Sequence, residues 1–182
     1  MRQARRTKCK YRNFKPLTYA CNSEITTFVF IKNKRQKMNT EELSELFRKH
    51  FKIDASAVTK LKGAGSNRQY FRLSNGDTTA IGVHGESAEE NRSFIKLAEH
   101  FAAQGLPTPK VFCHTDDYMF YLQEDLGSTA LFDAMENGVN TSSFSDAEKN
   151  LLFKTIEKLP DMQFKGAEGL DFSVCYPQSD FN

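Results

Sequence analysis

The sequence contains no tryptophan, no Cys-x-x-Cys pair and no apolar run long enough to span a bilayer. Its four cysteines are widely spaced, so they indicate neither a zinc site nor a redox pair. Its four histidines show no ligand spacing, and none follows His114. These absences favour a cytoplasmic protein with free thiols, without a membrane span or a structural metal.

Acidic residues are nearly missing from the first 37 positions, which hold eleven Lys or Arg and one acid, Glu24. The rest of the chain holds 14 Lys or Arg and 22 Asp or Glu. The 182 residues, 39% of them hydrophobic, suit one ordinary domain or a small domain with appendages. We therefore expect a basic, disordered extension (1–37), a main lobe (38–138) and a further segment (139–182).

The extension allows two interpretations. Met38 opens a segment of different character, so the first is that Met38 is the natural start and that residues 1–37 do not join the core. The second is a basic arm that binds nucleic acid or anionic lipid, with Tyr11, Phe14 and Tyr19 interleaved. The acidic body argues against a broad nucleic-acid surface, so we favour the first.

Two local patterns describe the chain before residue 57. The run Phe28–Ile31 could form one strand. Asn39-Thr40 ahead of two glutamates indicates the start of a helix that ends before Asp54. One face of this helix would carry Leu43, Leu46, Phe47, His50 and Phe51.

The middle of the chain predicts an antiparallel five-stranded sheet with one helix packed on it. Asn75-Gly76 is a strong hairpin signal, and Ser87 can cap a helix that Gly105 ends. The segments with strand character are 57–61, 69–73, 78–83, 110–114 and 118–123. The contacts that we expect are Phe94, Leu97 and Phe101 buried against Ile81, Val111 and Leu122.

The last third of the chain has weaker patterns. A short helix over 128–135, a polar linker over 139–144 and a capping box at Ser145–Glu148 are indicated. The helix after this box should stop at Pro160. Residues 160–182 have no clear period, and their aromatic side chains need a packing surface that the sequence does not reveal.

The stretch Gly63-Ala64-Gly65-Ser66-Asn67-Arg68 lies between the first two predicted strands. Its glycines can make a tight turn through positive φ, or they can let backbone N–H groups approach an anion such as phosphate. A short Gly-x-Gly is common, so the loop alone favours the turn.

This stretch, followed by Tyr70 at the start of a strand, is similar to the Gly-rich loop of the kinase-like small-molecule phosphotransferases. That family includes aminoglycoside phosphotransferases, choline kinases and bacterial cell-wall amino-sugar kinases. The resemblance implies an α+β, protein-kinase-like N-terminal lobe followed by the first helices of an incomplete C-terminal lobe. It also implies ATP and Mg²⁺ as cofactors in the complete enzyme, and a sugar or amino-sugar hydroxyl as acceptor.

In this family Gly63, Gly65, Ser66 and Asn67 would cover the nucleotide phosphates. Arg68 stands where protein kinases place the third glycine of the loop. It would offer a phosphate a forked set of donors, whereas the alternative is a solvated hairpin arginine.

The third strand of such a lobe usually carries a lysine that pairs with a helix glutamate. In this sequence Gly82 falls at that position, which leaves the matching helix residue, Glu90, without its usual partner. The alternative role of Glu90 is that of a first-turn acid that stabilises the helix dipole.

Glu124-Asp125-Leu126-Gly127 resembles the hinge of the family, in which adenine bonds to backbone groups. The implied partners are the Glu124 carbonyl and the Leu126 N–H. The alternative is a strand end followed by a helix cap at Ser128.

The catalytic aspartate loop and the metal-binding aspartate of the family have no match before Asn182. We therefore expect the chain to bind a nucleotide without transferring phosphate. Two alternatives stay open: a non-catalytic product that binds a partner through its apolar tail, and a nucleic-acid-binding protein that uses the basic arm.

Overall fold

The structure, a computed structural model, describes residues 22–63 and 65–177, and side chains from Lys37 onward. The chain divides into two units, Met1–Gln36 and Lys37–Asn182, and this boundary lies close to the change in charge at Met38.

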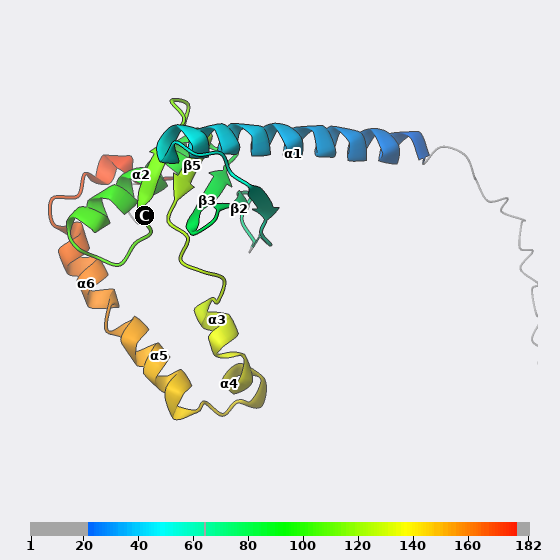
Figure 1. Ribbon diagram of the computed structural model, residues 1–182. Helices are drawn as coiled ribbons and strands as arrows, with labels where there is room; N and C mark the ends of the chain where they lie inside the picture. Colours follow the sequence, from blue (N-terminus) through cyan, green and yellow to red (C-terminus); the bar gives the residue numbers. More distant parts are fainter. Residues whose placement is uncertain (1–21, 64, 178–182) are drawn as a thin grey trace, which may run out of the picture. The chain divides into compact units, whose positions relative to one another are not determined.

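A five-stranded antiparallel sheet organises this unit, in the order β1-β2-β3-β5-β4 (Figure 1). Its strands are β1 Ala57–Lys60, β2 Gln69–Asn75, β3 Thr78–His84, β4 Val111–His114 and β5 Phe120–Gln123. The sheet and the α+β class are as the sequence predicted. The hairpin tip is shifted by one residue, because Asn75 pairs with Thr78 and Gly76 takes the positive φ of 57°.

The helix α1 spans Asn22–Phe51, so the predicted start at Asn39 and the predicted strand at Phe28–Ile31 are wrong. Residues 22–37 of the expected disordered extension are helical, and residues 1–21 lie outside the described part. The segment contains neither proline nor glycine, and Asn or Thr inside a helix costs only up to about 0.7 kcal/mol relative to Ala. The Thr40 hydroxyl donates to the Lys37 carbonyl at 2.8 Å and therefore bonds back along the helix instead of capping it.

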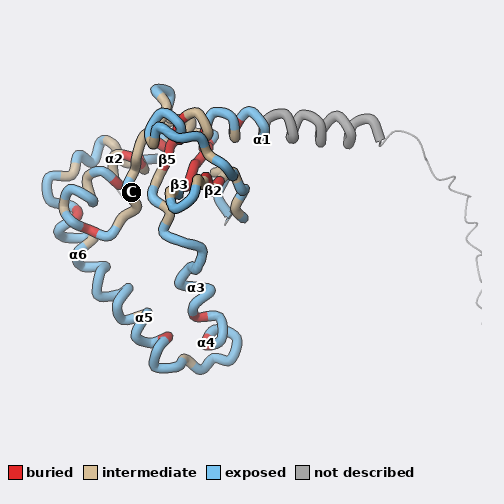
Figure 2. The backbone as a smooth tube through the Cα atoms, viewed as in Figure 1, coloured by how far each residue is buried: buried red, intermediate tan, exposed pale blue. Residues whose placement is uncertain are grey.

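Two cores lie on the two faces of the sheet. On the face that we call the α1 face, Leu43, Leu46 and Phe47 pack against strand residues. The strand residues of this core are Phe71, Leu73, Ala80 and Leu122. Because side chains alternate along a strand, Ile81, Val83 and Tyr121 point to the opposite face. Figure 2 shows these buried positions along the strands.

The second helix, α2 (Ala88–Ala103), covers this opposite face, which we call the α2 face. As predicted, Ser87 is its N-cap, and the Ser87 hydroxyl accepts from the Glu90 N–H at 3.2 Å. Ile95 is the fully buried anchor, whereas Phe94 is only partly buried. The expected contact of α2 with Leu122 is wrong, because Leu122 belongs to the α1 face and Tyr121 takes its place.

After β5 the chain forms short helices and turns. These are α3 Leu131–Ala134, α4 Glu136–Thr141, α5 Asp146–Ile156, α6 Leu159–Phe164, η1 Lys165–Ala167 and η2 Phe172–Val174. The Ser145–Glu148 capping box of α5 is confirmed, whereas Pro160 lies in the first turn of α6 and does not end α5.

The segment after α6 packs on α2, but the described aromatic side chains of residues 160–177 do not find the packing surface that the sequence called for, because Phe164 is 76%, Phe172 48% and Tyr176 47% exposed. The His100 ring bonds the Gly166 carbonyl at 2.9 Å, and the Gln104 side chain donates to the Glu168 carbonyl at 3.1 Å. A Cβ built at Gly166 would lie 3.1 Å from the Phe101 ring, so this contact is close.

Candidate functional site

The Gly-rich connection between β1 and β2 is an exposed loop. It is closed at its base by the Leu61 N–H, which donates to the Tyr70 carbonyl at 2.8 Å. Gly65 has φ 85°, a conformation that favours glycine, whereas a Cβ at Gly63 would meet nothing within 4 Å. The Ser66 hydroxyl accepts from the Arg68 N–H at 3.3 Å.

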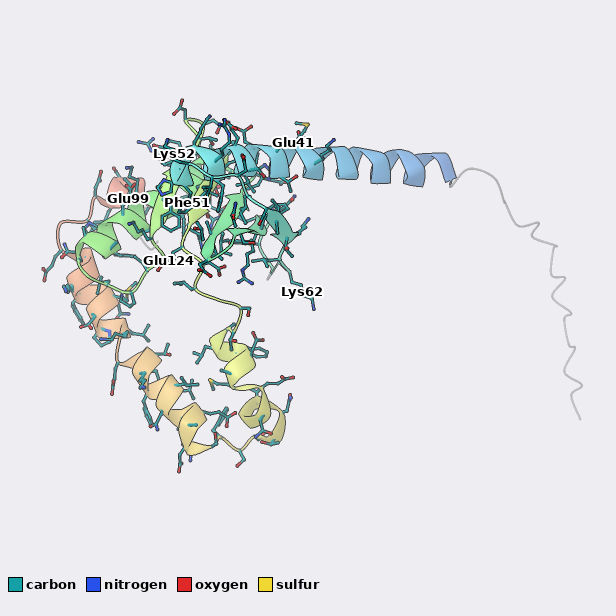
Figure 3. All side chains as sticks on the ribbon, viewed as in Figure 1. Glu41, Phe51, Lys52, Lys62, Glu99 and Glu124 are labelled. Atoms are coloured by element: carbon teal, nitrogen blue, oxygen red, sulfur yellow. The ribbon has the colours of Figure 1, made fainter. Side chains whose placement is uncertain are left out.

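The exposed side of this loop carries polar groups and a cation. Ser66 and Asn67 are exposed, and Ala64 lies outside the described residues. Figure 3 shows Lys62 extending from the loop away from the sheet. The loop thus has a glycine that the turn requires and residues that are exposed. Both features agree with a simple tight turn and also with a loop that binds an anion.

Arg68 is held by α2 and is not the solvated hairpin residue that one interpretation expected. Its Nη2 lies 2.9 Å from Glu90 Oε1 and donates to the Glu90 carbonyl at 3.3 Å. The guanidinium carbon lies 5.3 Å from the centre of the Phe94 ring, and the side chain is 14% exposed. The third-strand lysine that usually pairs with this glutamate is absent, as the sequence indicated, and Arg68 is the basic partner of Glu90 instead.

Gly82 does not face this ion pair. A Cβ at Gly82 would lie 2.7 Å from Leu73 Cδ1 and 2.9 Å from Leu43 Cδ2, inside the core of the α1 face. A lysine at position 82 would therefore point away from Glu90. The buried residues of β3 on the α2 face are Ile81 and Val83, which are both apolar.

A second ion pair joins β2 to the segment that leaves β5, and the sequence analysis did not find it. Arg72 Nε donates to Asp125 Oδ2 at 2.6 Å, and Arg72 Nη2 donates to Oδ1 at 2.9 Å. Arg72 also donates to the Gly127 carbonyl at 3.0 Å, while the Gly127 N–H donates to Asp125 Oδ1 at 3.0 Å. The hydrogen bond from Arg72 lowers the pKa of Asp125 below its ordinary value.

A signal for this pair is present in the sequence. Arg72 lies two residues after Tyr70, so strand alternation places both side chains on the α2 face. An arginine inside a half-buried strand needs an acidic partner. Asp125 is a candidate, because it lies two residues after the end of β5.

The exit segment itself presents backbone groups. The Glu124 N–H donates to the Lys110 carbonyl at 2.8 Å, and Glu124 Oε2 accepts from the Lys110 N–H at 3.2 Å. Among the described residues, neither the Glu124 carbonyl nor the Leu126 N–H takes part in a hydrogen bond. Glu124 and Leu126 are both exposed residues, and Leu126 is 70% exposed.

Several buried polar atoms in the described part of the chain have no hydrogen-bond partner. They are Arg68 Nε, Gln69 Oε1, Asn91 Oδ1, the Tyr121 hydroxyl and Gln123 Oε1. Tyr121 and Gln123 share the α2 face, because they alternate along β5. Burial raises the pKa of Tyr121 above its ordinary value. Unpaired buried groups are uncommon in proteins, and bound waters or ligands often complete them.

Other kinds of site have less support in the described residues. No group of three or more His, Cys, Asp and Glu side chains within residues 37–63 and 65–177 could hold a metal ion. In the same described part, none of the helices has the length and apolar character needed to cross a membrane. Burial raises the pKa of the Cys113 thiol, which disfavours the nucleophilic thiolate.

The chain was compared with known protein families and with curated proteins, and neither comparison found a match.

Proposed function

We propose that this chain is the nucleotide-binding lobe of an ATP-dependent phosphotransferase that acts on a small-molecule hydroxyl, of the sugar or amino-sugar class. One observation carries the proposal. Two arginines tie β2 to its neighbours: Arg68, just before the strand, pairs with the first turn of α2, and Arg72, in the middle of the strand, pairs with the exit segment of β5. The Gly-rich loop, α2 and the exit segment therefore border one sheet face.

The spacing of these parts suits an extended nucleoside triphosphate. Arg68 and Arg72 are four residues apart along an extended strand, which corresponds to about 13 Å. The exit segment at one end offers an acceptor at the Glu124 carbonyl and a donor at the Leu126 N–H, a pair that fits the edge of adenine. The loop at the other end offers N–H groups from Gly65, Ser66 and Asn67 that suit phosphate.

Within residues 37–63 and 65–177, no group of three or more His, Cys, Asp and Glu side chains could hold Mg²⁺. Three aspartates that follow β5 are engaged locally. Asp133 accepts from the Ala130 N–H, Asp171 accepts from the Ser173 N–H, and Asp161 pairs with Lys158. For this reason the proposal concerns nucleotide binding, and transfer of the phosphoryl group is not assigned to a described residue.

A second candidate function is a non-catalytic interaction protein, and one observation favours it. Helices α5 and α6 expose large apolar side chains that the rest of the described chain does not cover. They are Leu151, Phe153, Ile156, Leu159 and Phe164. Nucleic-acid binding through the basic arm stays a prediction, because Tyr11, Phe14 and Tyr19 lie outside the described residues.

Calorimetric titration of the 182-residue chain with ATP and with adenosine tests the proposal. We expect both to bind, and Leu126→Pro to weaken both, because proline removes the Leu126 N–H. Leu126→Ala is the matched control, because it keeps the N–H and changes only an exposed side chain. Equal affinities of the two variants, or no binding by the unaltered chain, would contradict the proposal.

A further inference from the structure

We infer that Arg68 is the residue of this chain that binds the phosphates of the nucleotide, oriented for this task by Glu90 and Phe94. The inference rests on the proposed function and assigns the cation of the same site. In the usual kinase-like lobe, a lysine of the third strand is the cation that pairs with the helix glutamate, whereas here the cation would come from the Gly-rich loop.

The third strand has no residue that can take this part. β3 contains neither lysine nor arginine, and its buried side chains on the α2 face, Ile81 and Val83, are apolar. Its histidine, His84, contacts Asn39 of α1 on the other face. Gly82 points into the core of the α1 face, so no side chain at position 82 could meet Glu90. Any cation beside Glu90 must therefore come from another element.

Arg68 comes from the end of the Gly-rich loop, immediately before β2. Arg68 directly follows the loop residues whose N–H groups would bind phosphate. Its side chain therefore starts close to the phosphate oxygens. Of the other nearby cations, Arg72 is bound to Asp125, and Lys62 is exposed on the outer side of the loop. Arg72 is also partly buried beside a carboxylate, but its Nε and Nη2 both donate to Asp125, whereas Arg68 contacts Glu90 through Nη2 alone.

The contacts of Arg68 leave part of its guanidinium for a ligand. Arginine has five N–H donors, and the contacts with Glu90 engage only Nη2. Nε is buried without a partner, so among the described residues the N–H groups left for a ligand are those of Nη1. The guanidinium carbon lies 5.3 Å from the centre of the Phe94 ring, which packs against it. Arginine stays protonated throughout the physiological range, so the site offers a permanent, forked positive charge. A charge held in place at 14% exposure also loses less entropy on binding than a mobile lysine.

Binding measurements with ATP, tripolyphosphate and adenosine on the full chain test the inference. Arg68→Gln should weaken ATP and tripolyphosphate about ten- to a hundred-fold, the range expected for lost charge-assisted hydrogen bonds, and leave adenosine unchanged. Arg68→Lys keeps the positive charge but not the forked set of donors. Its ATP affinity should lie between that of the unaltered chain and that of Arg68→Gln. Glu90→Gln should weaken ATP by a smaller factor, because Arg68 then loses its orientation.

Lys62→Gln is the matched control, because it removes one positive charge from the same loop at an exposed position. It should change ATP affinity less than about three-fold, as expected for an exposed and screened charge. Thermal unfolding of each variant reports whether the fold is retained, and Arg68→Lys provides the test if Arg68→Gln does not fold.

The outcomes separate the two proposals. Equal ratios of ATP to adenosine affinity in Arg68→Gln, Arg68→Lys and Lys62→Gln would overturn the role of Arg68 and leave nucleotide binding in place. Tripolyphosphate binding that depends on Arg68, without any adenosine binding, would support the phosphate site and overturn the nucleotide lobe. If the unaltered chain binds none of the three ligands, both proposals fall.

Discussion

Arg72 and Asp125 lie 53 residues apart in the sequence, and their side chains form a bidentate ion pair. Nε lies 2.6 Å from Oδ2, and Nη2 lies 2.9 Å from Oδ1. The Asp125 carboxylate also accepts from the Gly127 N–H, and Arg72 donates to the Gly127 carbonyl. The pair thus fixes the conformation of the exit segment, including the backbone groups on both sides of Asp125. In the proposed nucleotide lobe it would position these groups for the adenine ring.

Arg72→Met should destabilise the fold by about 1–3 kcal/mol, because it leaves the Asp125 carboxylate, 8% exposed, without its main partner. Urea unfolding at pH 7 measures this change. Arg48→Met provides the control, because the Arg48–Glu45 pair is exposed and should contribute less than about 1 kcal/mol. An equal loss in both variants would contradict a special role of the Arg72–Asp125 pair.

The same pair predicts a pH dependence. The pKa of Asp125 is lower in the folded state than in the unfolded state, so its contribution is fully present above the unfolded pKa, about 3.9. It is lost as the pH falls through the folded pKa. The stability difference between the unaltered chain and Asp125→Asn should therefore shrink as the pH is lowered below about 4. A constant difference from pH 7 to pH 3 would contradict the lowered pKa.

Gly82→Ala should lower the free energy of unfolding by about 1–3 kcal/mol, because the new methyl group overpacks the core of the α1 face. The Cβ would meet Leu73 at 2.7 Å and Leu43 at 2.9 Å. Gly63→Ala, whose Cβ would meet nothing within 4 Å, should change stability by less than about 1 kcal/mol. Chemical denaturation of both variants compares the two positions, and a neutral Gly82→Ala would show that Gly82 does not face this core.

Glu148 links α4 to α5, and its loss should loosen that connection. Its carboxylate accepts from the Ser145 N–H and hydroxyl and from the Gly138 N–H. The hydrogen bond from the Ser145 side chain is the main cause of its lowered pKa. Its stabilisation is therefore complete above the unfolded pKa, about 4.3, and is lost as the pH falls through the lower folded pKa.

Hydrogen exchange checks this link at the amides of Gly138 and Ser145. In Glu148→Ala both should exchange faster than in the unaltered chain at pH 6, while amides of β3 stay unchanged. Protection that is identical in the two proteins would contradict the contact. Lys149→Ala is the control, because Lys149 pairs with the exposed Asp146 and not with Glu148.

A chain that begins at Met38 should unfold within about 3 °C of the full chain, a shift that corresponds to less than about 1 kcal/mol for a domain of this size. The side chains of α1 in the core, Leu43, Leu46 and Phe47, all follow Met38. Calorimetric scans of the two chains give the comparison. Leu46→Ala is the comparison for the loss of a core side chain, and it should lower the free energy of unfolding by about 2–5 kcal/mol. A drop of many degrees on truncation would contradict the prediction.

Local patterns in the sequence determined the strands, the order of elements and two helix caps. The Ser87 cap and the Ser145–Glu148 box depend on residues three positions apart, so they form whatever the distant chain does. Strand alternation likewise showed that Ile81 and Val83 share a face. Residues 22–51 contain neither proline nor glycine, which is compatible with one continuous helix. The cap signal at Asn39 nevertheless led to the prediction of a helix that starts there.

Only the tertiary structure decided which face of the sheet each helix covers. A register shift of one residue moves every side chain of a strand to the other face, and the register of β5 against β3 joins segments that are far apart in the sequence. This is why Leu122 was assigned to the wrong core. The partners of Arg68 and Arg72 depend on the same register, since Glu90 and Asp125 come from elements that the folded sheet brings beside β2.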